Sequence, residues 1–160
     1  MLLSIMVTAT AMRVSISCAE RITLAAQRGA IRRAALGPLL RRSAEALGVG
    51  PRVSLAVRLT DDRELRELNL RFLGLDAPTD VLAFPADEPD RAGDIAISVE
   101  RAIAQDGGDG AAELRLLAVH GLLHCLGHDH AHPGQAAAMT AATRALLPAQ
   151  RVPELGAPGS

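Results

Sequence analysis

Lysine is absent from this sequence of 160 residues, cysteine occurs only twice, and neither sign of charge is in excess. The 17 basic residues, all of them arginine, face 18 acidic ones, so the net charge of -1 gives no global electrostatic case for binding nucleic acid. The use of arginine alone is typical of codon bias in a GC-rich genome. Cys18 and Cys125 are too few and too far apart for a disulfide framework, which fits a reducing cytoplasm.

Long apolar runs are also missing. The first twelve residues, MLLSIMVTATAM, are apolar, but serine and threonine interrupt them and no basic region precedes them. We therefore expect neither a signal peptide nor an association with a membrane. The length, with 49% hydrophobic and 22% charged residues, indicates one globular domain over residues 1–160. We expect residues 1–11 and the Pro/Gly-rich residues 149–160 to be disordered.

Short alternating segments and longer amphipathic ones predict the fold class. The predicted strands cover residues 12–17, 52–60, 81–84 and 93–98, and the last two are close enough in sequence to pair antiparallel. The predicted helices cover residues 61–74, 99–105, 111–126 and 133–147. An arginine-rich helical region joins the first two strands, and Gly37-Pro38 is expected either to kink it or to begin a new helix. The sequence therefore predicts an α+β fold with a small mixed sheet of about four strands packed with helices.

The segment HGLLHCLGHDH, residues 120–130, holds four of the five histidines. His120 and His124 lie four residues apart in a predicted helix, so both imidazoles fall on one face, about 6 Å apart along the axis. Gly127 can adopt the left-handed conformation that ends a helix and turns the chain back, which brings His130 toward the pair. The spacing predicts a metal site at the end of this helix.

Three neutral nitrogen donors with a fourth position open to water are typical of catalytic zinc. The metal ligands that we predict are His120, His124 and His130, which would hold one Zn²⁺ per chain, and the rest of the catalytic machinery stays unassigned. Cys125 points elsewhere on the helix. His128 and His132 are interpreted as surface residues. Asp129 is either a carboxylate that orients a ligand or a turn residue bonded to its own backbone.

The residue after His120 narrows the chemistry. Helical zinc peptidases have the pattern H-E-x-x-H, in which that glutamate is the general base, and here the position is Gly121. Peptide hydrolysis therefore becomes less favoured, and metal-assisted phosphodiester cleavage fits better.

HGLLHCLGHDH resembles the signature of the YbeY family of bacterial rRNA-processing endoribonucleases, H-G-x-L-H-L-x-G-[YH]-D-H, with Cys125 at a position where leucine is usual. Two upstream segments are similar to that family as well: LNLRFLGLDAPTDVLAFP at Leu68–Pro85 and GDIAIS at Gly93–Ser98. The resemblance implies a single-domain, single-strand-specific metal-dependent endoribonuclease of the cytoplasm, with the three histidines as zinc ligands. It also implies action in 16S rRNA 3′-end maturation and ribosome quality control, with ribosomal RNA, the small ribosomal subunit and assembly factors as partners.

One position departs from the family. An arginine that is thought to contact the substrate phosphate often precedes the glycine matching Gly74, but this chain has Leu73 there, and Arg71 is interpreted as a solvated helix residue. The resemblance further implies a basic groove, for which Arg32, Arg33, Arg41 and Arg42 are candidates, although a solvated helix face is the simpler interpretation. Two alternative functions stay open: hydrolysis of another ester or amide, and a ribosome-assembly factor in which the metal only staples helices.

Overall fold

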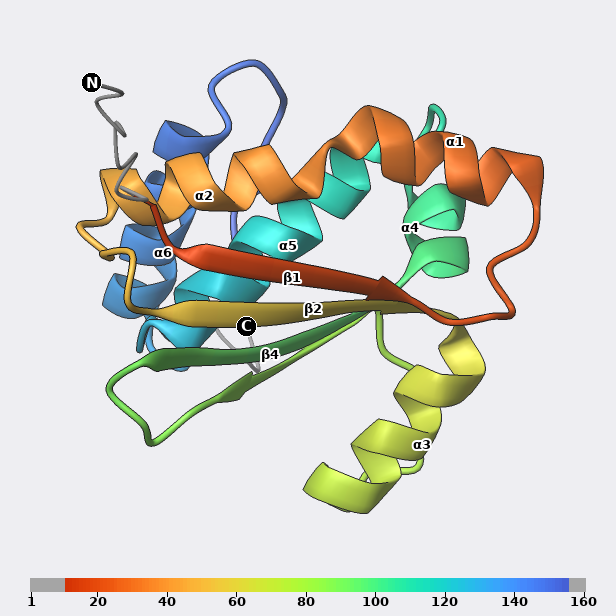
Figure 1. Ribbon diagram of the computed structural model, residues 1–160, viewed down its shortest axis with the longest axis horizontal. Helices are drawn as coiled ribbons and strands as arrows, with labels where there is room; N and C mark the ends of the chain where they lie inside the picture. Colours follow the sequence, from red (N-terminus) through yellow and green to blue (C-terminus); the bar gives the residue numbers. More distant parts are fainter. Residues whose placement is uncertain (1–10, 156–160) are drawn as a thin grey trace, which may run out of the picture.

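Four strands form a single sheet in this computed structural model, which describes residues 11–155 (Figure 1). They are β1 (Arg13–Cys18), β2 (Ser54–Thr60), β3 (Val81–Pro85) and β4 (Arg91–Ser98), in the spatial order β1-β2-β4-β3. Strands β1, β2 and β4 run parallel, whereas β3 pairs antiparallel with β4. The predicted α+β class, the mixed sheet and the antiparallel pairing are thereby confirmed.

Helices cover the sheet unequally. They are α1 (Ala25–Ala34), α2 (Leu36–Ala46), α3 (Asp62–Leu73), α4 (Val99–Gln105), α5 (Ala111–Cys125) and α6 (Pro133–Leu146). In Figure 1, α1, α2 and α5 lie on one side of the sheet, whereas α3 lies on the other. No helix within residues 11–155 is long and apolar enough to cross a membrane.

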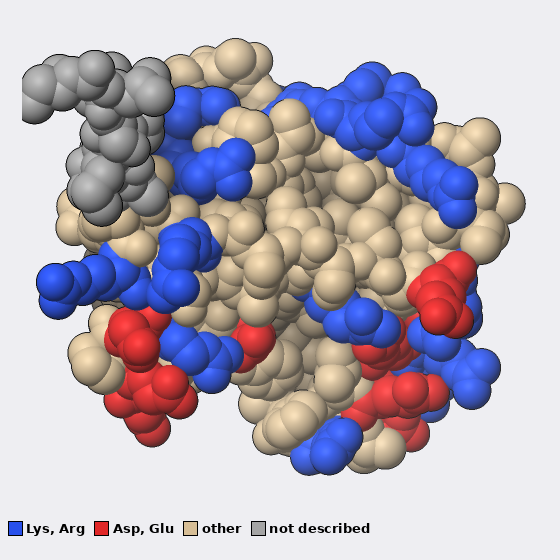
Figure 2. Space-filling view, in the orientation of Figure 1, with Lys and Arg blue, Asp and Glu red and all other residues tan. Residues whose placement is uncertain are grey.

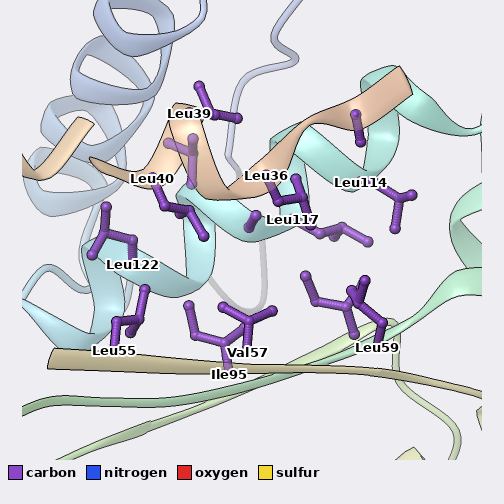
Figure 3. Close-up of a cluster of buried hydrophobic side chains, with 14 of the residues drawn as sticks. Leu36, Leu39, Leu40, Leu55, Val57, Leu59, Ile95, Leu114, Leu117 and Leu122 are labelled. Atoms are coloured by element: carbon purple, nitrogen blue, oxygen red, sulfur yellow. The ribbon is translucent and has the colours of Figure 1, made fainter. Parts of the chain in front are cut away.

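The core lies between the sheet and the α2–α5 layer (Figure 3). The alternation predicted for β2 places Leu55, Val57 and Leu59 on the inner face, where each is at most 1% exposed. Helix α5 packs on them from one side and carries α2 on its other side, so that nine of its residues are buried. This central position explains why α5 is apolar around most of its circumference and can hold the histidines at its end rigidly.

The break between α1 and α2 falls at Ala35, which has a positive φ of 48°, and not at Gly37-Pro38 as expected. Helix α2 begins at Leu36, so Pro38 lies within its first turn. Backbone N–H groups there have no partner inside the helix, and a proline therefore costs no hydrogen bond. The proline was correctly associated with a new helix, but that helix starts two residues earlier.

Helix α3 stands apart from the others but is capped as predicted. The Asp61 side chain accepts a hydrogen bond from the backbone N–H of Glu64, and Gly74 ends the helix with φ of 69°. Leu65 is buried, whereas Phe72 on the same face is 56% exposed, with its ring centroid 5.3 Å from that of Phe84. The far side of the sheet is therefore only partly covered.

The C-terminal segment packs against the helices without regular secondary structure. Residues 149–155 form no helix or strand, yet Val152 is only 8% exposed and the Gln150 side chain donates to the carbonyl of Ala112 at 2.8 Å. The backbone N–H of Leu155 donates to Thr140 Oγ1 at 3.1 Å. These hydrogen bonds tie residues 149–155 to α5 and α6. Residues 1–10 and 156–160 lie outside the described residues.

Candidate metal centre

His120 and His124 lie on the last turns of α5 and are both partly buried. Their Nε2 atoms are 3.1 Å apart and their ring centroids 4.6 Å apart, as the four-residue spacing requires. The helix holds the two rings in this relation because its other faces are packed against the sheet and α2. The two side chains therefore reach one point from a fixed support.

Gly127 turns the chain toward the site as predicted. Helix α5 ends at Cys125, Gly127 has φ of 94°, and the backbone N–H of His128 donates back to the carbonyl of Leu123 at 2.9 Å. This bond closes the last helical turn, as expected after a left-handed glycine. The reversal brings His130 to the pair, with ring centroids 5.7 Å from His120 and 5.3 Å from His124.

The three predicted residues form a cluster that suits a cation. One ring nitrogen of each histidine lies within 4.8 Å of the other two. Nitrogens bound at 2.0–2.1 Å to one tetrahedral ion are about 3.3 to 3.4 Å apart, close to the 3.1 Å between His120 and His124. In addition, Nδ1 of His130 is buried without a hydrogen-bond partner among residues 11–155. The donor set thus fits a zinc-like ion.

Burial and charge keep His120 and His124 in the neutral form that binds metal. Burial, followed by repulsion from His124 and His130, lowers the pKa of His120 to about 4. Burial and then His130 lower the pKa of His124 as well. A histidine must be neutral to ligate a metal, so little proton competition opposes binding near neutral pH.

The other polar residues of the motif lie outside this cluster. Cys125 packs against Gly93 of β4, and burial raises the pKa of its thiol to about 11, so the thiolate ligand form is disfavoured. The Asp129 carboxylate accepts the backbone N–H of His130 at 2.7 Å, which favours its interpretation as a turn residue. His128 and the exposed His132 are not members of the cluster.

Gly121 has a packing role that the sequence did not reveal. A Cβ atom at this position would lie 2.8 Å from Cγ2 of Ile95, closer than real contacts allow. Helix α5 therefore approaches β4 so closely that only glycine fits without displacement. A glutamate placed here, as in the peptidase pattern, would enter the core and not the face that carries the histidines.

A cavity of about 270 Å³ adjoins His120 and His130 and contains residues that the sequence analysis missed. Two of them are acidic, Asp80 before β3 and Glu113 at the start of α5. Glu113 lies seven residues before His120, a spacing of two turns that could have placed it on the same face. Asp80 gave no such signal, because only the fold brings β3 beside α5.

The arginines of α1 and α2 lie away from this cavity. Figure 2 shows basic side chains gathered over these two helices. The four candidates Arg32, Arg33, Arg41 and Arg42 are exposed, and none lines the cavity beside the histidines. Leu73 is 57% exposed at the end of α3, and the Arg71 guanidinium lies 5.2 Å from the ring centre of Phe72. Neither residue lines that cavity.

Comparisons with known proteins found a family model, several relatives and a solved structure that are similar to this chain. Residues 25–150 match the family model described as Endoribonuclease YbeY. The endoribonuclease YbeY of Moorella thermoacetica is 42% identical over 128 residues, covering 70% of this chain and 82% of that protein. The endoribonuclease YbeY of Chloroflexus aggregans is 40% identical over 134 residues, covering 72% of this chain and 88% of that protein. That of Gloeobacter violaceus is 52% identical over 91 residues, covering 49% of this chain and 47% of that protein. The solution structure of a Thermotoga maritima protein matches at a TM-score of 0.49 and 25% identity, covering 84% of this chain and 89% of that chain.

Proposed function

The chain belongs to the YbeY family of endoribonucleases, and from that premise we propose that its three-histidine cluster is the metal centre of an RNA-cleaving site. It is an endoribonuclease of rRNA processing. The observation that carries the proposal is the convergence of His120, His124 and His130 at the end of α5. Three donors without a fourth from residues 11–155 are typical of a catalytic zinc site with an open position.

The metal that we propose is one Zn²⁺ per chain. When bound, zinc lowers the pKa of a coordinated water and stabilises negative charge on a phosphate oxygen. The three imidazoles hold the ion, and the lowered pKa values of His120 and His124 keep these two neutral for it. Gly121 places no carboxylate beside His120, so this centre lacks the general base of the helical zinc peptidases. These features support a phosphodiester as the substrate.

The cellular setting is also part of the proposal. We propose single-stranded ribosomal RNA near the 16S 3′ end as the substrate, and the small ribosomal subunit and its assembly factors as partners, in the cytoplasm. Family membership supports this setting. The nature of the products tests the chemistry: a 2′,3′-cyclic phosphate would indicate attack by the RNA's own 2′-hydroxyl, and its absence would favour water as the nucleophile.

The decisive variant is His124→Ala, measured for bound zinc and for cleavage of single-stranded RNA. We expect the variant to lose its zinc and at least roughly 100-fold of its cleavage rate, because a direct ligand contributes no less than a residue that only orients one. The matched control is His132→Ala, since His132 is exposed and outside the cluster. This control should retain both zinc and activity.

Circular dichroism of the same variants distinguishes a catalytic metal from one that only holds the C-terminal helices together. A catalytic metal predicts that His124→Ala keeps its helix content and folds cooperatively. If the metal only staples the C-terminal helices, His124→Ala unfolds instead, and wild-type protein has no cleavage activity to lose. Wild-type protein that contains no metal when freshly purified would refute the proposed metal centre.

A further inference from the structure

The cavity beside the histidines extends along one face of α5. Glu113, Leu116, Leu117 and His120 line it from this helix, and residues of the other elements close its remaining sides. Its walls are mostly apolar, and further lining residues are Val81, Val152, Pro153 and Leu155. An apolar pocket with a few polar groups at defined points is the usual form of a small-ligand site.

Two carboxylates mark the end of the cavity away from the histidines. With its amide nitrogen turned toward them, Gln105 donates to Glu113 Oε1 at 3.1 Å and to Asp80 Oδ2 at 3.2 Å. One amide group thus holds the two acids close together. Burial, and then the negative charges of Asp80 and Asp106, raise the pKa of the Glu113 carboxyl. The carboxyl oxygens that Gln105 leaves free can accept hydrogen bonds from a ligand.

The spacing between the two ends suits a nucleotide. Glu113 and His120 are seven residues apart on one helix face, which corresponds to roughly 10 Å along the axis. A phosphate held at the histidines would therefore leave room for its ribose and base to extend toward the acids. The negative charge of Asp80 and Glu113 disfavours a second phosphate at that end, because like charges repel. The nucleobase, which is uncharged, is the part of the RNA that fits.

We propose that this cavity binds one nucleobase next to the scissile phosphate, with the base edge donating to Asp80 and Glu113. This inference rests on the proposed function, since it places the phosphate at the three histidines. The apolar side chains of α5 and of residues 152–155 contact the faces of the base. RNA-binding proteins commonly read single-stranded RNA by hydrogen bonds to the exposed edge of an unstacked base.

The chemistry of the acids sets the order of preference. Guanine presents an N–H and an amino group side by side on its Watson–Crick edge, and carboxylates accept such donors. Cytosine and adenine present one amino group each. Uracil presents a single N–H between two carbonyl oxygens, and those oxygens would face the carboxylates. We therefore expect guanine to bind best and uracil worst.

Binding of guanosine and uridine 5′-monophosphates to the full chain tests the cavity without any chemical step. Titrations followed by NMR should show the guanosine nucleotide binding at least roughly 5-fold more tightly, within the range that one well-placed base contact supplies. Glu113→Gln should abolish this preference, because an amide offers both a donor and an acceptor. The matched control is Glu67→Gln on α3, an exposed residue paired with Arg63, which should retain the preference.

A cleavage assay then separates this inference from the proposed function. The substrates are short single-stranded RNAs in which one base, on one side or the other of the cut, is varied. On one side of the cut only, the cleavage rate should depend on the base and should fall in the order guanine, then cytosine or adenine, then uracil. Cleavage without any base preference in wild type, or a preference unchanged in Glu113→Gln, overturns the nucleobase pocket but leaves the endoribonuclease intact. Conversely, wild-type protein that binds guanosine 5′-monophosphate preferentially but does not cleave RNA refutes the proposed function and leaves the nucleobase pocket intact.

Discussion

At the scale of single residues, Gly121 shows how one position can serve both chemistry and packing. Glycine stands here where helical zinc peptidases have their catalytic glutamate, and the absence of a side chain also lets α5 approach Ile95 of β4. A glycine inside a helix costs about 1 kcal/mol relative to alanine. The close contact outweighs this loss of helix propensity, because a side chain at this position would push the helix that carries His120 and His124 away from the sheet.

Gly121→Ala should lower the free energy of unfolding by about 1–2 kcal/mol, because overpacking a core outweighs the gain in helix propensity. The matched control is Gly134→Ala in α6, where a Cβ would meet nothing within 4 Å. This control should be neutral or slightly stabilising. Urea denaturation of the two variants measures both values, and equal stability of Gly121→Ala and wild type would contradict the packing role.

At the scale of elements, the turn after α5 decides whether three histidines meet. Gly127→Ala forces a side chain into the left-handed conformation at φ of 94°, at a cost of roughly 1–2 kcal/mol. Because the turn positions His130, zinc affinity should also fall at least about 10-fold. Gly48→Ala is the control, since Gly48 has φ of 77° with open space around it and is not part of the cluster.

Both glycine variants should therefore lose similar stability, and only Gly127→Ala should lose zinc. Thermal denaturation of metal-free protein and competition with a zinc chelator provide the two measurements. An equal zinc affinity in the two variants would show that His130 does not depend on this turn, and that the turn is a structural feature only.

The start of α3 is anchored to β4 and α4 by Asp62. Its carboxylate accepts from the Ser98 hydroxyl at 2.7 Å and from the Arg101 guanidinium at 2.8 and 3.0 Å. The hydrogen bond from Arg101, against the opposing effect of burial, lowers the pKa of Asp62 below its ordinary value of 3.8. A carboxyl whose pKa is lower in the folded chain stabilises the fold above the unfolded value.

Asp62→Asn should therefore lower the free energy of unfolding by about 0.5–1 kcal/mol at neutral pH, the upper range for a partly exposed ion pair. The stabilisation is complete above the ordinary pKa and is lost as the pH falls through the lowered value, so the difference between variant and wild type should disappear in acid. Denaturation curves at several pH values measure this difference. A difference that is the same at every pH would exclude the ionised carboxylate as its cause.

At the scale of the whole molecule, charge is distributed unevenly although it nearly cancels. Arginines gather over α1 and α2 (Figure 2). The cavity beside the histidines, in contrast, contains Asp80 and Glu113. A basic surface attracts RNA over a distance and an acidic pocket does not. The α1–α2 arginines therefore stay candidates for holding the RNA backbone, on a surface separate from the cavity.

The double variant Arg41→Gln/Arg42→Gln tests that surface. If both side chains contact phosphates, the slope of log binding constant against log salt should become shallower by about 1.4 for single-stranded RNA. Zinc content should not change, because neither residue lies in the histidine cluster. The control is Arg63→Gln on α3, where the arginine is paired with Glu67. An unchanged slope in the double variant would assign these arginines to solvent alone.

The sequence by itself determined the parts of this protein that depend on near neighbours. Alternation placed Leu55, Val57 and Leu59 on one face, and capping residues bounded α3. The spacing of His120, His124 and His130 around Gly127 predicted the cluster. These features follow from the geometry of one helix, strand or turn, which acts over a few residues.

Only the tertiary structure decided what lies beside that cluster. It brought Asp80 to Glu113 and the histidines, packed Gly121 on Ile95, and closed the cavity with Val152, Pro153 and Leu155. These residues are distant in sequence and share no periodic pattern. Their proximity results from burying the apolar faces of the sheet and α5 together, a free energy summed over the whole core that no local spacing records.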